Sequence, residues 1–324
     1  NISGLTYNGI ANTNGVIANN ISAGTYTITA SGITATNYNI VYKSAKLTVN
    51  KAQFTVSASW DNTNLGTVNW SVNEIGPSTV NVHAKNFTIQ LKLGGTVVST
   101  YTVAYQDENA YNTTTGTYSY NLAGVITSGN AGSYTVTVIA NSDNESVNAG
   151  QATTSTLTAR KVTLVKGDKG IASVKFNNAT KVTTNADGSI SAVYIYGHEG
   201  KITVSITGST ANLVGGYSFN EWSGTTGLTF KTGNKNTATI EFNLPDADLT
   251  LTATSKVTNV YTITYNLGGG TINDTTYTTK YKVDQEITLP KLVKRAGYTF
   301  IGWQITKVSP WASDGNEASW GLNN

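Results

Sequence analysis

The sequence predicts an all-β protein built from several small modules in a rod-like row. The chain is rich in Thr, Asn, Gly and Tyr, and only 12% of its residues are charged, a composition that favours strands and tight turns. Short alternating segments are separated by turn residues throughout. In addition, one aromatic pattern, G-Y-x-F-x-x-W, occurs twice, at 216–222 and at 297–303. Such a repeat indicates two copies of one small β unit.

The spacing within this pattern predicts a bulged strand. Side chains alternate between the faces of a strand, so Tyr and Phe share a face, whereas Trp three residues later falls on the other. An extra residue between Phe and Trp restores a common face, and we expect Gly302 to allow it in the second copy. We therefore predict that six residues form structural cores. They are Tyr217, Phe219, Trp222, Tyr298, Phe300 and Trp303.

Composition excludes several classes of site. Without cysteine, the chain has no disulfide scaffold, zinc-thiolate site, iron–sulfur cluster or catalytic thiol. The net charge of +3 is spread thinly, so we predict no binding of nucleic acid and no direct insertion into a membrane. The sequence reads as a piece of a longer protein, and the lack of an export signal does not indicate a cytosolic protein.

Residues 1–52 are expected to contain strands at 26–29, 38–42 and 46–49, with hairpin turns at Asn8-Gly9 and Asn14-Gly15. Their motifs resemble the MBG-type repeats of large bacterial surface proteins, and we expect the first strands of such a repeat to be missing. The motifs that carry this resemblance are Tyr7–Gly9, Ala23–Tyr26, Asn37–Ile40 and Lys46–Ala52.

Residues 53–160 have the strand spacing of a sandwich, with Trp60 and Trp70 as core candidates. The segment Ala131–Val138 resembles the penultimate strand of a fibronectin type III or immunoglobulin-like module. The expected strands are 54–60, 68–72, 88–93, 97–105, 117–122 and 134–140.

Residues 161–258 begin with a strand at 162–165 and are expected to contain a hairpin of 190–196 with 201–206. Together with 216–224 and the closing run 242–253, the segment resembles the divergent bacterial repeat related to the internalin B-repeat.

Residues 259–324 are similar to the internalin B-repeat proper, of the Listeria–Bacteroides type. The resemblance rests on Tyr261–Gly270 and Arg295–Trp303 and implies a small β-grasp-like fold. The chain departs from the pattern at Asp284-Gln285, where the family usually carries glycine. The end, Trp311–Asn324, does not read as the closing strand, so we expect this repeat to be cut short or to carry an insertion.

No residue is a convincing catalytic, cofactor or metal candidate. The two histidines, His83 and His198, have no nucleophile or ligand cluster nearby in sequence, and we expect surface positions. Asp107-Glu108 point to opposite faces of a strand, and Asp246 with Asp248 lack the further oxygens that calcium needs. We predict no enzyme activity and no cofactor.

Aromatic side chains are the best binding candidates, because Tyr and Trp stack on sugars and anchor protein partners. Trp311 and Trp320 are the expected ligand-binding residues, while Trp222 and Trp303 fit a core better. The three joints Lys51-Ala52, Arg160-Lys161 and Val257–Asn259 lack proline and glycine, which favours semi-rigid links.

The function predicted from these resemblances is a non-catalytic stalk or adhesive region of a large secreted bacterial cell-surface protein. Its expected partners are host or environmental glycans and proteins, or copies of itself. Two alternatives stay open: a self-assembling surface-layer or filament subunit, and a glycan-binding segment of an extracellular glycan-degrading enzyme.

Overall fold

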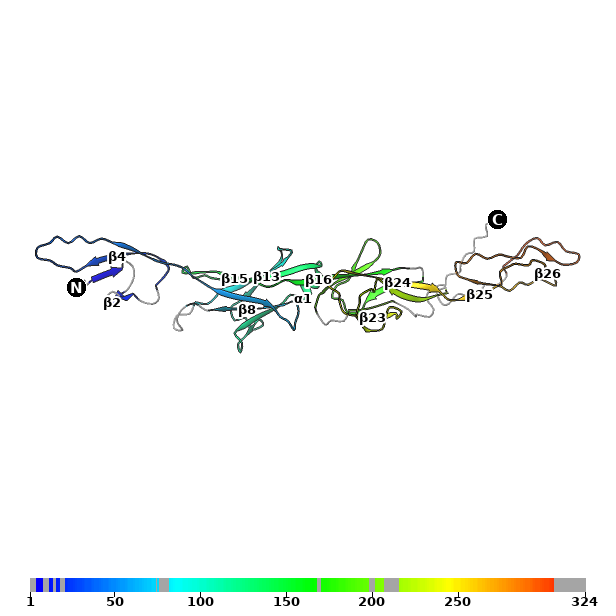
Figure 1. The fold of residues 1–324 in the computed structure, drawn as a ribbon, viewed down its shortest axis with the longest axis horizontal. Helices are drawn as coiled ribbons and strands as arrows, with labels where there is room; N and C mark the ends of the chain where they lie inside the picture. Colours follow the sequence, from blue (N-terminus) through cyan, green and yellow to red (C-terminus); the bar gives the residue numbers. More distant parts are fainter. Residues whose placement is uncertain are drawn as a thin grey trace. The chain divides into compact units, whose positions relative to one another are not determined.

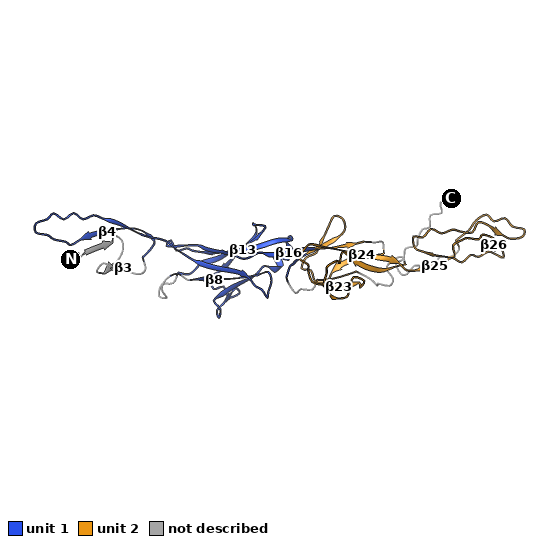
Figure 2. Cartoon of the chain, in the orientation of Figure 1, with its two compact units in different colours: residues 1–161, 193–198 blue, residues 162–192, 199–324 orange. Residues whose placement is uncertain are grey.

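The computed structural model describes residues 4–7, 12–13, 16–17, 21–73, 75, 82–167, 170–197, 202–206 and 216–305. These residues form β-strands with one short helix, α1 (Ala123–Ser128), which confirms the predicted all-β class and its tandem β organisation (Figure 1). The chain divides into two compact units, coloured separately in Figure 2. Unit 1 comprises Asn1–Lys161 and Val193–His198, and unit 2 comprises Val162–Ala192 and Glu199–Asn324.

The N-terminal part of unit 1 is a thin antiparallel sheet in the order β1-β4-β5. Its strands are β1 (Gly4–Tyr7), β4 (Gly24–Ser31) and β5 (Ala45–Val49), and a separate pair joins β2 (Asn12–Thr13) with β3 (Val16–Ile17). The alternating pattern of β4 matches the strand predicted at 26–29, and β5 matches that at 46–49. The turns expected at Asn8-Gly9 and Asn14-Gly15 lie outside the described residues.

The strand predicted at 38–42 is wrong. This segment has no strand partner, and Tyr38 and Val41 are 82% and 77% exposed. Local structure comes instead from Tyr42, whose hydroxyl accepts a hydrogen bond from the backbone N–H of Ile33 at 2.6 Å and donates one to its carbonyl at 2.8 Å. A segment with alternating polar and apolar residues forms a strand only where another strand can pair with its backbone.

The rest of unit 1 is a sandwich of two sheets. One sheet runs β10-β9-β13, with β15 and residues 157–159 of β16 pairing along the far side of β13. The other runs β11-β12-β8-β7, and β14 pairs in parallel with β6. The bounds are β6 (Ala52–Gln53), β7 (Thr55–Trp60), β8 (Thr67–Asn73), β9 (Asn86–Leu93), β10 (Thr96–Ala104), β11 (Tyr111–Asn112), β12 (Thr117–Asn121), β13 (Gly132–Asn141), β14 (Val147–Asn148), β15 (Gly150–Thr153) and β16 (Leu157–Lys166).

The sandwich core is organised around Trp70, which is 2% exposed. Its ring stacks on Tyr118 with centroids 5.3 Å apart and meets the edge of Phe87 at 5.6 Å, so both sheets contribute to one aromatic cluster. Trp60 is 8% exposed and donates its indole N–H to the carbonyl of Ser155 at 2.9 Å. Both tryptophans therefore lie in the core, as the sequence predicts.

Unit 2 places β24 (Leu249–Val257) between two partners. It pairs in parallel with residues 162–166 of β16 and antiparallel with β21 (Tyr217–Ser223). A second sheet has the order β17-β20-β23-β22, and β18 (Thr183–Thr184) pairs with β19 (Ile190–Ile195). The second-sheet strands are β17 (Val174–Phe176), β20 (Ile202–Ile206), β22 (Phe230–Thr232) and β23 (Thr239–Phe242).

The hairpin predicted from 190–196 and 201–206 is wrong, although both strands exist. β20 already has β17 on one edge and β23 on the other, while β19 pairs with β18. Both long edges of β20 are thus occupied by other strands. Hydrophobic alternation identifies a strand but not its neighbour, and here the adjacent segments in sequence are not partners.

The C-terminal part of unit 2 consists of two short pairs. β25 (Val260–Thr262) pairs with β27 (Lys280–Lys282), and β26 (Thr271–Ile272) pairs with β28 (Val293–Lys294). Gly268 and Gly269 have φ values of 56° and 91° in a tight turn before β26, where the N–H of Gly270 bonds the carbonyl of Leu267 at 2.9 Å. Glycine tolerates such left-handed conformations without strain.

Gly150→Ala should destabilise unit 1 by about 2–3 kcal/mol, because an added Cβ would lie 1.9 Å from the carbonyl oxygen of Phe54. Gly124→Ala is the matched control: its Cβ would meet nothing within 4 Å, and alanine favours the helix by about 0.5–1 kcal/mol. Urea unfolding followed by circular dichroism measures both. Equal midpoints for the two variants would contradict the close packing of β15 on Phe54.

Candidate functional site

The first copy of the aromatic pattern lies on β21 and contains the predicted bulge. The register with β24 shifts between Phe219 and Glu221, which makes Asn220 the extra residue. Phe219 and Trp222 consequently share one face and are 6% and 0% exposed, with ring centroids 6.1 Å apart. Tyr217, at the start of the strand, is half-buried.

The other edge of β21 is covered by the turn at 234–236. The N–H of Trp222 bonds the carbonyl of Lys235 at 2.7 Å, and the Asn236 side chain donates to the carbonyl of Asn220 at 3.0 Å. The Lys235 ammonium also lies 2.8 Å from the Glu221 carboxylate. These contacts satisfy backbone groups on the edge of β21 that faces away from β24. The sequence pattern alone did not identify this turn as the cover.

The second copy of the pattern is built differently. Residues 297–303 form no strand, and Tyr298 is 66% exposed beneath the Arg295 guanidinium, 4.0 Å from the ring centroid. The expected core position of Tyr298 is therefore wrong. Among the described residues, no strand ladder pairs with this segment apart from the single bridge between Arg295 and Tyr298, so none of them gives a sheet face that buries the ring.

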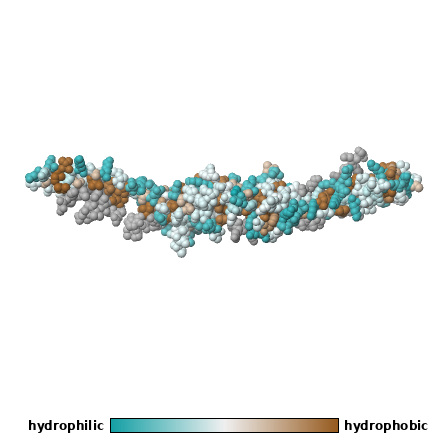
Figure 3. All heavy atoms as spheres, viewed as in Figure 1, coloured by the Kyte–Doolittle hydropathy of each residue, from teal (hydrophilic) through white to brown (hydrophobic). Residues whose placement is uncertain are grey.

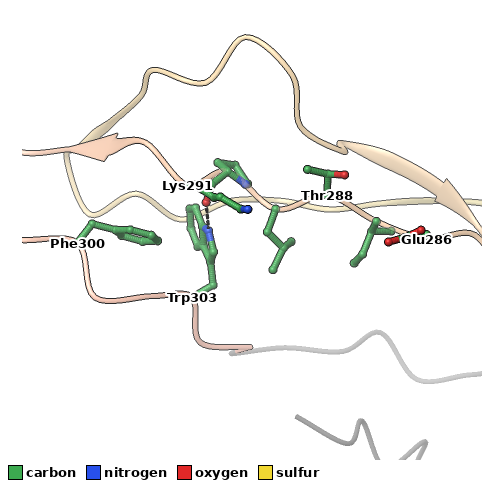
Figure 4. Close-up of a pocket in the computed structure, with 8 residues that line it drawn as sticks. Glu286, Thr288, Lys291, Phe300 and Trp303 are labelled. Carbon is green, nitrogen blue, oxygen red and sulfur yellow. Dashed lines mark hydrogen bonds between the residues drawn. The ribbon is translucent and has the colours of Figure 1, made fainter. Parts of the chain in front are cut away.

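Phe300 and Trp303 nonetheless meet, with ring centroids 5.3 Å apart, and both are half-buried. Tyr265 takes the place expected for Tyr298, at 4.9 Å from Trp303. The Trp303 indole N–H donates to the carbonyl of Pro290 at 2.6 Å, which fixes the ring against the 286–291 segment (Figure 4).

These residues line an open hollow of ≈ 410 Å³. Figure 4 shows Phe300 and Trp303 beside Lys291, with Glu286 at the far end of the row. The lining runs from the aromatic rings, with Lys291 beside Trp303, to the carboxylate of Glu286 at the other end, a combination that suits an amphipathic ligand such as a sugar. The lining residues are Glu286, Ile287, Thr288, Leu289, Pro290, Lys291, Phe300 and Trp303.

Tyr265 packs against Trp303 of the hollow and is hydrogen-bonded to the neighbouring segment. Its hydroxyl donates to the carbonyl of Thr278 at 2.6 Å, and the N–H of Thr278 in turn bonds the carbonyl of Thr288 at 2.7 Å. Burial, and to a lesser extent the neighbouring Tyr277, raises the pKa of Tyr265, so the hydroxyl keeps its proton and remains a donor. The hollow is thus braced by hydrogen bonds.

A second notable feature joins the two repeats of unit 2. Asp284 has φ = 57°, the left-handed conformation in which glycine is strain-free, and this fits the glycine that the family resemblance leads us to expect at Asp284-Gln285. Here the aspartate adds a contact that glycine lacks: its carboxylate accepts a hydrogen bond from the Tyr217 hydroxyl at 2.6 Å. The backbone N–H groups of Thr258 and Asn259 both donate to the carbonyl of Gly216 at 3.2 Å, so the joint itself is bonded to the preceding repeat.

The other sequence candidates form no site. Trp311, Trp320 and His198 lie outside the described residues. The His83 ring packs on Tyr105, with centroids 4.7 Å apart. Within the described part of the chain, no group of three or more His, Asp or Glu side chains is arranged to hold a metal ion, and no helix is long and apolar enough to cross a membrane.

Surface hydropathy is mixed. On the face shown in Figure 3, hydrophobic residues occur in small groups between hydrophilic ones. The exposed apolar side chains of unit 2 include Ile287 and Leu289 in the lining of the hollow, at 36% and 39% exposed, and Leu292, which follows Lys291 in the chain, at 56%. The hollow is therefore accompanied by exposed apolar side chains.

Comparison with family models confirms two of the resemblances. Residues 178–258 match the divergent InlB B-repeat domain, and residues 261–313 match the Listeria-Bacteroides repeat domain. The chain thus carries two adjacent repeats of the bacterial surface type. Both matches lie beyond residue 177, so the MBG-type and fibronectin III resemblances of the first half stay predictions.

Among solved structures, the chain is similar to BcpA, the major pilin subunit of Bacillus cereus, at 13% identity and a TM-score of 0.23. The match covers 72% of this chain and 85% of the pilin. A single-substitution variant of the same pilin matches at 12% identity and a TM-score of 0.22. These TM-scores are too low to define a shared fold. No curated protein matches the chain.

The two tryptophans of the repeated pattern should differ in their contribution to stability. Trp222→Ala, which empties a fully buried site, should cost about 3–5 kcal/mol. Trp303→Ala, at a half-buried site with one hydrogen bond, should cost about 1–2 kcal/mol. Urea unfolding followed by circular dichroism gives both values.

Tyr298→Ala is the control for this pair, since the exposed ring should contribute no more than about 1 kcal/mol. A cost for Trp303→Ala equal to that for Trp222→Ala would show that Trp303 belongs to a closed core, which contradicts an open hollow.

Proposed function

We propose that the chain is a non-catalytic extracellular segment of a bacterial cell-surface protein, acting as a spacer that carries an adhesive face. The observation that carries this proposal is the pair of adjacent surface-type repeats at 178–258 and 261–313. Repeats joined in series extend a chain by a fixed increment, which is what a spacer requires. The first half of the chain supplies two further modules, at 1–52 and 53–160, in the same proposal.

The joint between the two repeats supports a spacer role. Free linkers behave as flexible coils, whereas residues 257–259 leave β24 and enter β25 within a few residues. The hydrogen bond between Tyr217 and Asp284 ties the side chain that begins β21 to the turn that follows β27. A carboxylate acceptor makes this bond stronger than one between neutral groups.

The hollow at Trp303 is the proposed adhesive face. Phe300 and Trp303 offer aromatic surface, Lys291 offers an ammonium group beside Trp303, and Glu286 offers a carboxylate at the other end of the row. Recognition of glycans or short peptides at such a face needs no reacting group. This is why we favour binding over catalysis for unit 2.

The joint is tested by measuring how widely the distance across it varies. The chain has no cysteine, so spin labels are introduced cleanly through Thr250→Cys and Thr276→Cys, both at exposed positions. With the Tyr217–Asp284 bond intact, double electron–electron resonance should give one narrow distribution of the distance between the two spin labels. Tyr217→Phe removes only the hydroxyl and should broaden it, as should Asp284→Gly.

Tyr298→Phe is the matched control, because it removes a hydroxyl from an exposed tyrosine of the same repeat. It should leave the distribution unchanged. A distribution that is already broad in the parent chain, or that Tyr217→Phe does not alter, would contradict a stiff joint and with it the spacer role.

Small-angle scattering tests the rod-like row that the joint sequences predict. The maximum dimension in solution should clearly exceed that of a compact sphere of 34.2 kDa. A compact value would mean that the modules fold back on one another, and it would refute the spacer while leaving the adhesive face to be tested on a glycan panel.

A further inference from the structure

The β10 strand of unit 1 forms an open edge of the sandwich. It pairs with β9 along one side, from Thr96 to Ala104, and no other described strand pairs with its second side. At nine residues it is among the longest strands of the chain. An unpaired strand edge presents a row of backbone donors and acceptors to solvent, and these can pair with another chain.

The edge of the same sandwich near the start of β7 is covered by backbone from elsewhere in the chain, in contrast to β10. There β6 pairs with β14, and the N–H of Phe54, just before β7, donates to the carbonyl of Asn148 at 3.3 Å. Gly150 approaches the carbonyl of Phe54 so closely that no side chain fits between them. The chain thus covers the β7 edge with its own backbone.

The side chains of β10 give the edge little protection of its own. Its sequence, Thr-Val-Val-Ser-Thr-Tyr-Thr-Val-Ala, has no charge and no proline, two of the means by which proteins block unwanted pairing; a third, a β-bulge, occurs only near its start. Val97 and Val98 are 44% and 48% exposed. The one irregularity is a bulge at Val98, and beyond it the register with β9 is regular from Ser99 to Ala104.

We propose that β10 pairs antiparallel with β10 of a second copy of this chain, so that the two sheets become continuous. A second copy is the occupant that the chemistry favours: each strand brings no charge, so identical strands meet without like-charge repulsion, and their β-branched and aromatic residues form favourable cross-strand pairs. The arrangement is a two-fold symmetric, isologous contact.

The alternation of side chains restricts the register of this contact. Opposed residues in an antiparallel pair project to the same face, and the inner faces of both copies must lie on the same side of the joined sheet. One residue must therefore face its own copy across the two-fold axis. Within the regular part of β10 the central choices are Tyr101 and Thr102. An axis at Tyr101 places Thr100 opposite Thr102, and an axis at Thr102 places Thr102 opposite itself.

This inference goes beyond the proposed spacer and does not depend on it. A spacer works as a single chain, whereas β10 pairing would join two chains side by side through residues 53–160. The scattering and spin-label results at low concentration are therefore independent of whether this contact forms.

Disulfide trapping reads the register directly. Opposed residues of an antiparallel pair have Cα atoms about 4.5–5.5 Å apart, within the range of a disulfide. Thr102→Cys should cross-link with itself under mild air oxidation if the axis is at Thr102, and a mixture of Thr100→Cys with Thr102→Cys chains should form the mixed product if it is at Tyr101. The parent chain, which has no cysteine, gives the blank.

Sedimentation equilibrium measures the association itself. The full chain should show a monomer–dimer equilibrium, and the double variant Thr100→Lys/Thr102→Lys should weaken it about tenfold or more, because like charges then face each other in either register. Both threonines are exposed, so the monomer should stay folded by circular dichroism. The matched control, Thr55→Lys/Ser119→Lys, adds the same charge at exposed positions of the other sheet and should leave the equilibrium unchanged.

Two results would overturn the proposal. One is a chain that remains monomeric up to the highest concentration measured. The other is a dimer that is equally stable in the β10 double variant and gives neither cross-linked product, which would place the contact elsewhere on the molecule.

Discussion

The structure depends on large aromatic side chains that close cores between short strands. A strand of six or seven residues offers only a few inward positions, so each position must bury much area. Trp70 does this for the sandwich, through Phe87 and Tyr118, and Trp222 does it for the first repeat of unit 2. The first repeat also needs the bulge at Asn220, because without this extra residue Trp222 would lie on the opposite face of β21 from Phe219.

The same constraint explains why the two copies of one pattern differ. β21 has β24 on one side and the turn at 234–236 on the other, so its aromatic residues face a complete sheet. Residues 297–303 have no such neighbours among the described residues, and their rings gather around Tyr265 and Pro290 instead. An identical motif therefore yields a closed core in one setting and an open hollow in the other.

Sequence reasoning recovered what is set by local pattern. The all-β class, most strand positions, the bulge in β21 and the unusual residue at Asp284 all follow from alternation, spacing or a missing glycine. It failed where distant partners decide. The segment at 38–42 has strand-like alternation but no neighbour, and β19 and β20 are adjacent in sequence but pair with other strands. The Tyr217–Asp284 bond joins residues 67 apart in sequence, and the hollow requires Trp303 to contact Pro290 across a turn; no local pattern reveals either contact.

The parallel pairing of β16 with β24 has a mechanical consequence. β16 precedes the repeat matched at 178–258 and β24 ends it, and five residue pairs join the two strands, from Val162 with Leu249 to Lys166 with Ala253. Tension applied at the start of one strand and the end of the other acts along the strands and loads all five pairs together. Two strands pulled in this way must slide past each other, whereas a hairpin pulled at its open end would unzip one pair at a time. Within a tethered surface protein, this repeat would resist extension as a clamp does.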